Sequence, residues 1–349
     1  MQDNHSKYMQ RCLELAALGR YLTAPNPRVG AVLVHENQIV AEGYHQKYGS
    51  AHAEKSAIDN LQDKKLLSEC TLYVNLEPCS HFGKTPPCAD LILESKIPKV
   101  VIGTRDTSDK VAGKGIAKLK QNGIEVLEDV LSKECRLLNK RFFTYHEKKR
   151  PYIILKWAQT GDGFIADADL KSKWISCEQS RELVHEWRAE ESAILVGTNT
   201  ARQDNPHLTA RPKNLTVEQY NQPLRIVIDR NLTLSKLNLY DDSAKTLIVN
   251  AVKSGLSGMH EFLQVNFEGD LYTQVCNALH SKQITSVIVE GGAVVLNALI
   301  TEGLYDEARV FKSNKIFGGG IKAPEMKSTV LSRETIGTDV LKSYINHSF

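Results

Sequence analysis

One stretch decides how this 349-residue chain is interpreted: Leu76-Glu77-Pro78-Cys79-Ser80-His81-Phe82-Gly83-Lys84-Thr85-Pro86-Pro87-Cys88. It connects a predicted buried strand over 71–76 to a predicted helix over 88–95, and His52 opens an earlier predicted helix over 52–61. One histidine nitrogen and two thiolates are the donors that zinc prefers. Three protein ligands leave one position for water, whose pKa the metal lowers toward neutrality. His52, Cys79 and Cys88 therefore predict a catalytic zinc site.

Glu54 lies two residues after His52 and can carry protons between water and a leaving group, as deamination requires. A structural alternative stays open, because paired cysteines often pack in a core and a closed zinc site needs a fourth ligand. His81 or Cys70 is available for that position. The order of the residues favours catalysis, since zinc deaminases carry His-x-Glu followed by Pro-Cys-x-x-Cys. Here eight residues separate the two cysteines.

The first 146 residues alternate strand-like and helix-like segments with short connections, which is typical of a layered α/β domain with a largely covered sheet. Two apolar runs flank Glu36-Asn37 and predict a strand hairpin. The expected strands are 31–34, 38–41, 71–76, 99–102 and 124–127, and the expected helices are 52–61, 88–95, 116–122 and 131–145, after an N-terminal helix around 9–17.

A second α/β pattern follows a charged segment that ends in proline, 147–151, which we interpret as a linker. We expect domains over 1–146 and 152–349. The expected strands of the second domain are 152–155, 193–196, 225–228, 246–249 and 286–289, with a helix over 178–190.

The chemistry of the second domain is less evident from its residues. Glu290-Gly291-Gly292 follows a strand and is either a tight turn or a phosphate cradle at the start of a helix. Trp174 can stack on a flat ring or pack in the core, and core packing is favoured. Arg188 and Arg211 are candidate phosphate anchors, because guanidinium groups pair with phosphate oxygens.

Composition excludes several classes of protein. With 44 basic and 41 acidic residues, the net charge of +3 lacks the concentrated basic excess of nucleic-acid-binding proteins. No run of 18 apolar residues predicts a membrane span, and the N-terminus has no apolar signal-peptide core. Seven cysteines are too few for a disulfide scaffold, so we expect a cytoplasmic protein with no membrane or nucleic-acid partner.

The stretch around Cys79 and Cys88 closely resembles the deaminase half of the bifunctional RibD family of riboflavin biosynthesis. Four further segments are similar to that family: Pro25-Asn26-Pro27-Arg28-Val29-Gly30, Gly43-Tyr44-His45, His52-Ala53-Glu54 and Val111-Ala112-Gly113-Lys114-Gly115. The resemblance implies a cytidine-deaminase-like three-layer α/β/α domain with one zinc per chain on His52, Cys79 and Cys88. It implies Glu54 as proton carrier, and a substrate pocket that includes Asn26 and the 80–84 loop. Asp106-Thr107-Ser108-Asp109 departs from the family's usual Asp-Pro-Asn-Pro.

The second half is similar to the reductase domain of the same family, which implies a dihydrofolate-reductase-like α/β fold and NADPH. The similarity includes Pro151-Tyr152, Leu155-Lys156, Trp174-Ile175, Arg188-Ala189, Leu208-Thr209-Ala210-Arg211 and Val289-Glu290-Gly291-Gly292. Departures occur at Gly161, Asn205 and Arg230, and no proton donor stands out. The resemblance implies NADPH contacts at Ala158, Trp174, Thr200, Asp204, Gly292, Ala293, Val294, Val295, Leu296, Asn297 and Ala298. It implies substrate contacts at Ser172, Arg188, Leu208, Arg211 and Glu290.

The activity implied is zinc-dependent hydrolytic deamination of 2,5-diamino-6-(5-phosphoribosylamino)pyrimidin-4-one. NADPH-dependent reduction of the ribosyl group of 5-amino-6-(5-phosphoribosylamino)uracil to ribityl follows. The partners implied are these small molecules and further copies of the chain, in a dimer or tetramer. Three alternatives stay open: a deaminase with a decayed reductase domain, a nucleic-acid base deaminase such as a tRNA-editing enzyme, and a non-enzymatic zinc-stabilised binding module.

Overall fold

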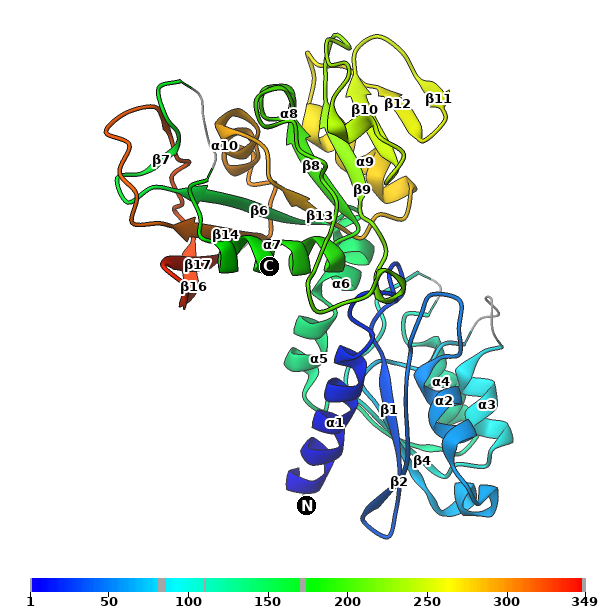
Figure 1. The fold of residues 1–349 in the computed structure, drawn as a ribbon. Coiled ribbons are helices and arrows are strands. Elements are labelled where there is room, and N and C mark those ends of the chain that lie inside the picture. Colours follow the sequence, from blue (N-terminus) through cyan, green and yellow to red (C-terminus); the bar gives the residue numbers. More distant parts are fainter. Residues whose placement is uncertain (1, 81–85, 110, 170–173, 347–349) are drawn as a thin grey trace. The chain divides into compact units, whose positions relative to one another are not determined.

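The computed structural model divides the chain into two compact units, residues 1–149 and 150–349 (Figure 1). It describes residues 2–80, 86–109, 111–169 and 174–346. The division falls inside the segment 147–151, where helix α6 continues through Lys148 and strand β6 begins at Tyr152. The first two residues of the expected linker are therefore helical.

The first unit is built on a five-stranded sheet with the order β2-β1-β3-β4-β5. The predicted hairpin is confirmed: β1 and β2 are antiparallel, and Glu36 and Asn37 have positive φ angles of 47° and 63° at the turn. Strands β3, β4 and β5 run parallel to one another, so the loops that follow them emerge at one edge of the sheet. The strands are β1 (Gly30–His35), β2 (Gln38–Tyr44), β3 (Thr71–Val74), β4 (Lys99–Ile102) and β5 (Glu125–Leu127).

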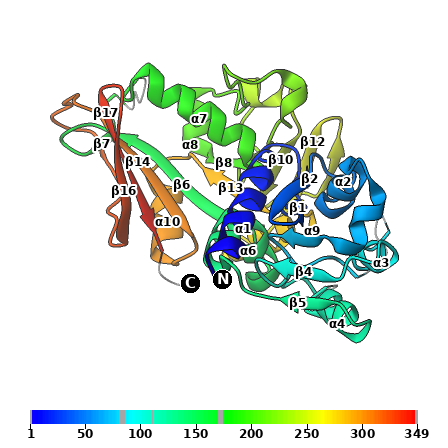
Figure 2. The same ribbon diagram turned by 90° about the horizontal axis from the view of Figure 1, so that it is seen from below.

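Helices cover both faces of this sheet and make three layers (Figures 1 and 2). On one face Met9 and Cys12 of α1 and Cys135 of α5 pack against β1, and on the other α2, α3 and α4 bury residues such as Ile92. The helix predicted over 131–145 is two helices, which meet at Asn139, whose side chain hydrogen-bonds the backbone of Arg28. The helices are α1 (Gln2–Ala17), α2 (Ala53–Asn60), α3 (Cys88–Glu94), α4 (Lys114–Gln121), α5 (Ser132–Leu138) and α6 (Lys140–Lys148), with a 3-10 helix over Lys64–Glu69.

The second unit contains a ten-stranded sheet with the order β11-β12-β10-β9-β8-β13-β6-β14-β17-β16, and a two-stranded sheet of β15 and β7. All five strands predicted for this unit are confirmed, and they form a parallel central block. The strands are β6 (Tyr152–Gln159), β7 (Phe164–Ala166), β8 (Ala193–Gly197), β9 (Leu224–Ile228), β10 (Thr246–Asn250), β11 (Gly255–Ser257), β12 (His260–Gln264), β13 (Ser286–Val289), β14 (Glu307–Lys312), β15 (Ile321–Lys322), β16 (Thr329–Ile336) and β17 (Asp339–Ile345).

Successive side chains of β6 point to opposite faces of the sheet, and each face packs against different helices. Tyr152 and Ile154 pack with α7, whereas Ile153 and Leu155 pack with α9 and α10. Both ribbon views place α7 and α10 on opposite sides of β6 (Figures 1 and 2). The helices are α7 (Glu178–Glu190), α8 (Thr198–Asp204), α9 (Leu271–Ser281) and α10 (Ala293–Thr301), with 3-10 helices over Val217–Gln219 and Asn238–Tyr240.

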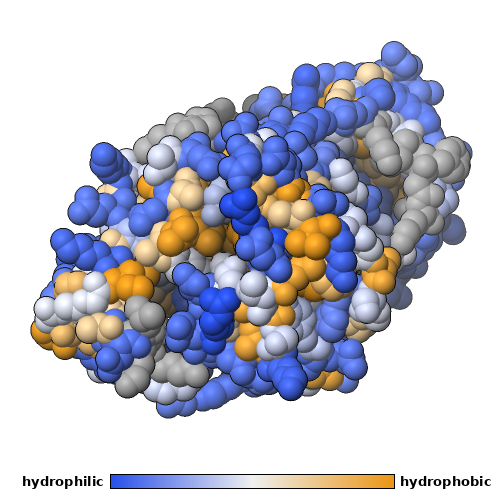
Figure 3. All heavy atoms as spheres, turned by 90° about the horizontal axis from the view of Figure 1, so that it is seen from above, coloured by the Kyte–Doolittle hydropathy of each residue, from blue (hydrophilic) through white to orange (hydrophobic). Residues whose placement is uncertain are grey.

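Within the described residues, no helix combines the length and apolarity that crossing a membrane requires. On the face drawn in Figure 3, hydrophilic residues cover most of the surface and hydrophobic residues lie in small groups among them.

Candidate active sites

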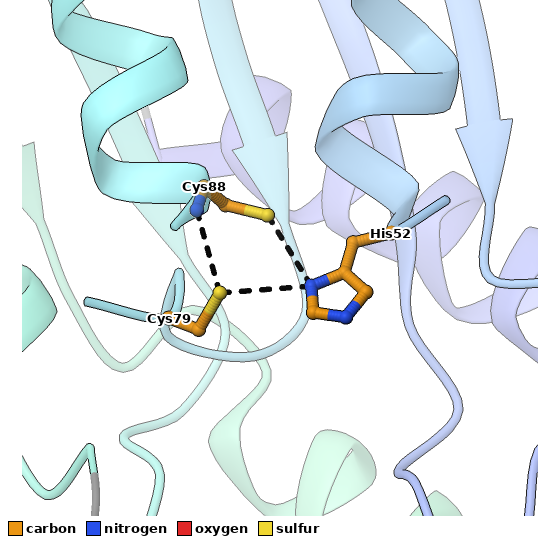
Figure 4. Close-up of side chains that lie close together, drawn as sticks. All are labelled: His52, Cys79 and Cys88. Carbon is orange, nitrogen blue, oxygen red and sulfur yellow. Dashed lines mark hydrogen bonds between the residues drawn. The ribbon is translucent and has the colours of Figure 1, made fainter. Parts of the chain in front are cut away.

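The structure brings together the three predicted zinc ligands (Figure 4). His52 immediately precedes α2, Cys88 is the first residue of α3, and Cys79 lies on the connection between β3 and α3. The His52 Nδ1 atom is 3.6 Å from the Cys79 sulfur and 3.3 Å from the Cys88 sulfur. The Cys88 backbone N–H donates to the Cys79 sulfur at 3.3 Å. Residues 36 positions apart in the sequence thus share one small volume.

The spacing of these atoms fits zinc. A tetrahedral zinc with Zn–S bonds of about 2.3 Å and Zn–N bonds of about 2.0–2.1 Å holds nitrogen and sulfur about 3.5 Å apart. The two N–S distances found here, 3.6 and 3.3 Å, bracket that value. The three donor atoms all lie within 4.8 Å of one another. The donor set and its geometry therefore suit a zinc ion with three protein ligands.

The position of Cys70 does not support the alternative of a closed zinc site with four protein ligands. Among the described residues, the cluster of metal-ligand side chains contains His52, Cys79 and Cys88 without Cys70. Cys70 precedes β3, so the length of that strand separates it from Cys79. His81, the other residue considered, and the rest of the 81–85 segment lie outside the described residues.

Glu54 lies in the first turn of α2 and is buried, with 3% of its surface exposed. Burial raises the pKa of its carboxyl group, and the neighbouring His52 imidazole opposes this rise. Hydrogen bonding by Cys88 is the main effect that lowers the pKa of Cys79, which favours its thiolate form. Glu54 thus combines a buried carboxyl group of raised pKa with a place beside His52, and its role as proton carrier stays a prediction.

His45 connects Asn26 to the metal cluster, because it contacts both Asn26 and His52. The buried His45 ring packs edge-on against His52, with ring centroids 5.4 Å apart. Its Nδ1 atom is 3.0 Å from the carbonyl oxygen of Ala51, and its Nε2 atom is 3.1 Å from the Asn26 side-chain nitrogen. If Nδ1 carries the proton, Nε2 accepts from the Asn26 amide, which leaves the Asn26 Oδ1 atom for another donor. Sequence reasoning gave His45 no role beyond its motif.

The second unit contains a cavity of about 1360 Å³. Its lining includes the ends of strands β6 and β8, the start of α10 and one side of α7. Pockets for single small molecules span about 300–1,000 Å³, so this cavity has room for a dinucleotide and a second ligand together. This cavity is the candidate functional site of the second unit, as the metal cluster is that of the first unit.

Most of the residues expected at NADPH line this cavity, but three do not. Leu296 is buried in the hydrophobic core, Asn297 is exposed, and Ala298 packs against the core. The residues of α10 that line the cavity all belong to its first turn, and cofactor contacts at Leu296, Asn297 and Ala298 stay predictions. The expected residues that line it are Ala158, Trp174, Thr200, Asp204, Gly292, Ala293, Val294 and Val295.

Four of the expected substrate residues, Arg188, Leu208, Arg211 and Glu290, line the cavity, and Ser172 lies outside the described residues. The Arg188 guanidinium donates to Glu290 at 2.7 and 2.8 Å, and the Lys156 ammonium is 3.5 Å from the same carboxylate. Burial alone raises the pKa of Glu290, but Arg188 and Lys156 outweigh it and lower the pKa to about 2. This end of the cavity therefore holds an ionised carboxylate between two cations.

Arg211 lies near that group and has no acidic partner within the described part of the chain, and its guanidinium donates to the Thr209 hydroxyl. Burial and the charge of Arg188 lower the pKa of Arg211. An anion that entered here would relieve the repulsion between the two guanidinium groups.

Trp174 corrects one expectation, because it is 62% exposed and lines the cavity, with the Arg181 guanidinium 4.6 Å from its ring centroid. Core packing was favoured from the sequence, since an isolated tryptophan carries no signal of which surface it faces. Sequence reasoning also missed Lys156, Arg181 and His185 as cavity residues. Spacing was an available signal, because Arg181, His185 and Arg188 fall on one face of a helix.

The two glycines after Glu290 lie against β8 and α8. A Cβ atom on Gly291 would be 2.6 Å from the Gly197 backbone nitrogen, and one on Gly292 would be 2.9 Å from the Thr200 hydroxyl oxygen. Glycine is required here for close packing of the chain beside the cavity.

Among the departures from the family pattern, Asn205 has a φ of 42° and binds Asn238 through its side chain and its backbone. Asparagine tolerates this left-handed conformation well. Arg230 pairs with the exposed Glu268 and is not among the cavity-lining residues. A Cβ atom on Gly161 would come within 3.2 Å of Ile316, and Gly161 is also not among the cavity-lining residues.

Two protein families match the chain, one for each half. Residues 2–104 match the cytidine and deoxycytidylate deaminase zinc-binding region, and residues 151–342 match the RibD C-terminal domain. Among curated relatives, the riboflavin biosynthesis protein RibD of Aquifex aeolicus is 41% identical, over 93% of this chain and 91% of its own length. The RibD protein of Escherichia coli is 37% identical, over 91% of this chain and 89% of its own length.

Solved structures agree with these matches over the whole chain. A diaminohydroxyphosphoribosylaminopyrimidine deaminase/5-amino-6-(5-phosphoribosylamino)uracil reductase from Thermotoga maritima is 37% identical with a TM-score of 0.88. A RibD structure from Acinetobacter baumannii is 30% identical with a TM-score of 0.92. Each comparison covers 99% of both chains. The matches thus cover both units of this chain, with the deaminase zinc-binding region in the first and the RibD C-terminal domain in the second.

Proposed function

This chain belongs to the RibD family of bifunctional deaminases and reductases of riboflavin biosynthesis, and from that premise we propose which of its residues carry each reaction. The substrate proposed for the first unit is 2,5-diamino-6-(5-phosphoribosylamino)pyrimidin-4-one. Its deaminated product, 5-amino-6-(5-phosphoribosylamino)uracil, is the proposed substrate of the second unit. The similarity to the Thermotoga maritima diaminohydroxyphosphoribosylaminopyrimidine deaminase/5-amino-6-(5-phosphoribosylamino)uracil reductase supports both substrates.

The observation that carries the deaminase proposal is the convergence of one imidazole nitrogen and two sulfurs at zinc spacing beside a buried carboxyl group. His52, Cys79 and Cys88 would hold the metal, which when bound supplies a Lewis acid that makes water nucleophilic near neutral pH. Helix α3 begins at Cys88, whose backbone N–H donates to the Cys79 sulfur at 3.3 Å and favours its thiolate form.

Glu54 would take the proton from the attacking water and deliver it to the departing amino group as ammonia leaves. Its burial beside the ligands supports this role, because a carboxyl group with a raised pKa both accepts and returns a proton efficiently. Asn26, whose side-chain nitrogen lies 3.1 Å from His45, would present its Oδ1 atom to an N–H group of the pyrimidine ring.

For the reductase, Arg188 and Arg211 would bind the substrate phosphate, and Glu290 would hold Arg188 in place. NADPH, when bound, supplies the hydride that reduces the ring-opened sugar at C1. Ala158, Thr200, Asp204 and the first turn of α10 would face the cofactor, with Trp174 beside it. The intact cavity and its charged lining favour a working reductase over a decayed domain.

Replacing Glu54 by Ala tests the proton carrier. We expect ammonia release to disappear, while zinc content stays near one per chain and NADPH oxidation with the uracil substrate is retained. Asp59→Asn, an exposed carboxylate on the same helix, is the control and should keep full activity. Loss of the metal in Glu54→Ala would instead make Glu54 a ligand or a structural residue and refute the proposed role.

We also propose a cytoplasmic homo-oligomer, a dimer or a tetramer. Strand β16 supports self-association, because it lies at an edge of the ten-stranded sheet and exposes Val330 and Leu331 by 50% and 61%. Sedimentation equilibrium on the purified chain provides the test, and a monomer throughout the micromolar range would contradict it.

A further inference from the structure

Glu77 is a buried carboxylate, 4% exposed, two residues before Cys79. Each of its oxygens accepts two backbone N–H groups. Oε2 accepts from Asp106 at 3.1 Å and from Gly113 at 3.0 Å, and Oε1 accepts from Gly115 at 3.0 Å and from Ile116 at 3.2 Å. All four donors belong to the connection between β4 and α4 and to the first turn of α4. One side chain therefore holds both ends of that connection.

The same segment also contacts the backbone on either side of Glu77. The Glu77 N–H donates to the Thr104 carbonyl at 3.0 Å. A Cβ atom on Gly115 would lie 2.0 Å from the Pro78 carbonyl oxygen, so only glycine allows this approach. The link from the β4–α4 connection to Cys79 therefore passes through two adjacent residues, Glu77 and Pro78.

Topology places this link beside the deamination site. Strands β3 and β4 are parallel neighbours, so the loop that carries Cys79 and the loop that carries Asp106 leave the same edge of the sheet. In open α/β sheets, ligands bind outside this carboxyl edge. The β4–α4 connection therefore stands where it can form a wall of the substrate pocket next to the metal cluster.

We propose that Glu77 is a positioning residue of the deaminase, which fixes the β4–α4 connection relative to Cys79 so that the connection can contact the pyrimidine substrate. In this chain Asp106-Thr107-Ser108-Asp109 opens that connection without prolines to stiffen it. The carboxylate supplies the restraint, together with a turn in which the Ser108 N–H donates to Asp106 at 2.6 Å. The inference rests on the proposed site, because it takes Cys79 as a ligand.

Glu77→Gln is the test, because glutamine has the same shape but replaces one oxygen by an NH₂ group that cannot accept two N–H donors. We expect the KM of deamination to rise at least tenfold, with kcat changed less than threefold and zinc content near one per chain. NADPH oxidation with the uracil substrate should stay within twofold and shows that the chain has folded. Glu125→Gln, an exposed carboxylate on β5, is the matched control and should keep the wild-type KM.

Gly115→Ala provides a second variant that leaves the carboxylate untouched. Alanine favours a helix over glycine, so this change is stabilising unless the close approach to Pro78 matters. We expect it to raise KM as Glu77→Gln does.

Three results would overturn the inference: wild-type KM in zinc-loaded Glu77→Gln, activity that falls only in proportion to lost zinc, or a fall confined to kcat. Wild-type protein that binds no zinc would instead refute the proposed metal site, so the two failures are distinguishable.

Discussion

Replacing Glu290 by Gln should destabilise the second unit by about 3 kcal/mol at pH 7. A glutamate whose pKa is about 2 in the folded chain and about 4.3 when unfolded contributes about this amount. The structure gives an independent estimate, since Glu290 is the shared partner of Arg188 and Lys156. Breaking a buried ion pair by removing one partner costs about 3–5 kcal/mol, because the remaining charge stays buried.

Differential scanning calorimetry of the intact chain measures this effect. For a unit of this size, about 3 kcal/mol lowers the melting temperature by about 6–12 °C. Added NADPH, the proposed cofactor, should identify the transition of the second unit, because a ligand raises the melting temperature of the domain that binds it. Glu268→Gln is the control, and its midpoint should not move, because the Arg230–Glu268 pair is exposed and such pairs contribute little.

The contribution of Glu290 to the free energy of unfolding depends on pH. Because the folded pKa of Glu290 is lowered, its contribution is complete above the unfolded pKa and is lost as pH falls toward about 2. The difference in unfolding free energy between wild type and Glu290→Gln should therefore narrow from about 3 kcal/mol at pH 7 to about 1.5 kcal/mol at pH 3. A shift below about 2 °C at pH 7, or a difference that is equal at both pH values, would refute this account of the carboxylate.

Two further predictions concern the separate sites. Arg211→Ala should weaken binding of the uracil substrate by about tenfold or more while NADPH affinity changes little, since a charge-assisted hydrogen bond to phosphate is lost. Titration of each ligand measures this, Arg230→Ala, an exposed arginine outside the cavity lining, is the control, and equal losses for both ligands would contradict the assignment. Treatment with a zinc chelator should abolish ammonia release and leave NADPH oxidation with the uracil substrate within about twofold of its untreated rate, because the proposed metal ligands all belong to the first unit. Added zinc should restore the lost activity, and simultaneous loss of both activities would contradict the division of labour between the units.

Local sequence patterns predicted the central strands of both sheets. The parallel strands are short apolar runs bounded by polar turns, and their burial on both faces follows from the helices between them. The strands that the sequence analysis missed lie toward the edges. Strand β16, for example, is exposed along nearly all of its length, so its residues carry no apolar run or clean alternation. Helix α8 was missed because it has seven residues and its only fully buried side chain is Ala201.

In the candidate sites too, the sequence could identify some residues and not others. His52, Glu54, Cys79 and Cys88 could be singled out as candidates because side chains that bind metal or carry protons are chemically distinctive and occur here in a family-specific order. Trp174 could not be assigned to a surface, since a tryptophan suits a core and a ligand pocket equally well. The sequence could not tell which residues of α10 line the cavity, because a helix that starts at a cavity rotates its later residues away from it.

The sequence by itself determined the candidate donor set, the candidate acid/base residue Glu54 and the α/β character of both units, since each depends on residue chemistry or on periodicity over a few turns. Only the tertiary structure decided that Glu290 pairs with Arg188, that α7 lines the cavity with Arg181, His185 and Arg188, and that Glu77 holds the β4–α4 connection. Arg188 and Glu290 lie 102 residues apart, and they meet because of the order in which strands pair. Strand order is set by the packing of the whole unit, so no local pattern in the chain encodes it.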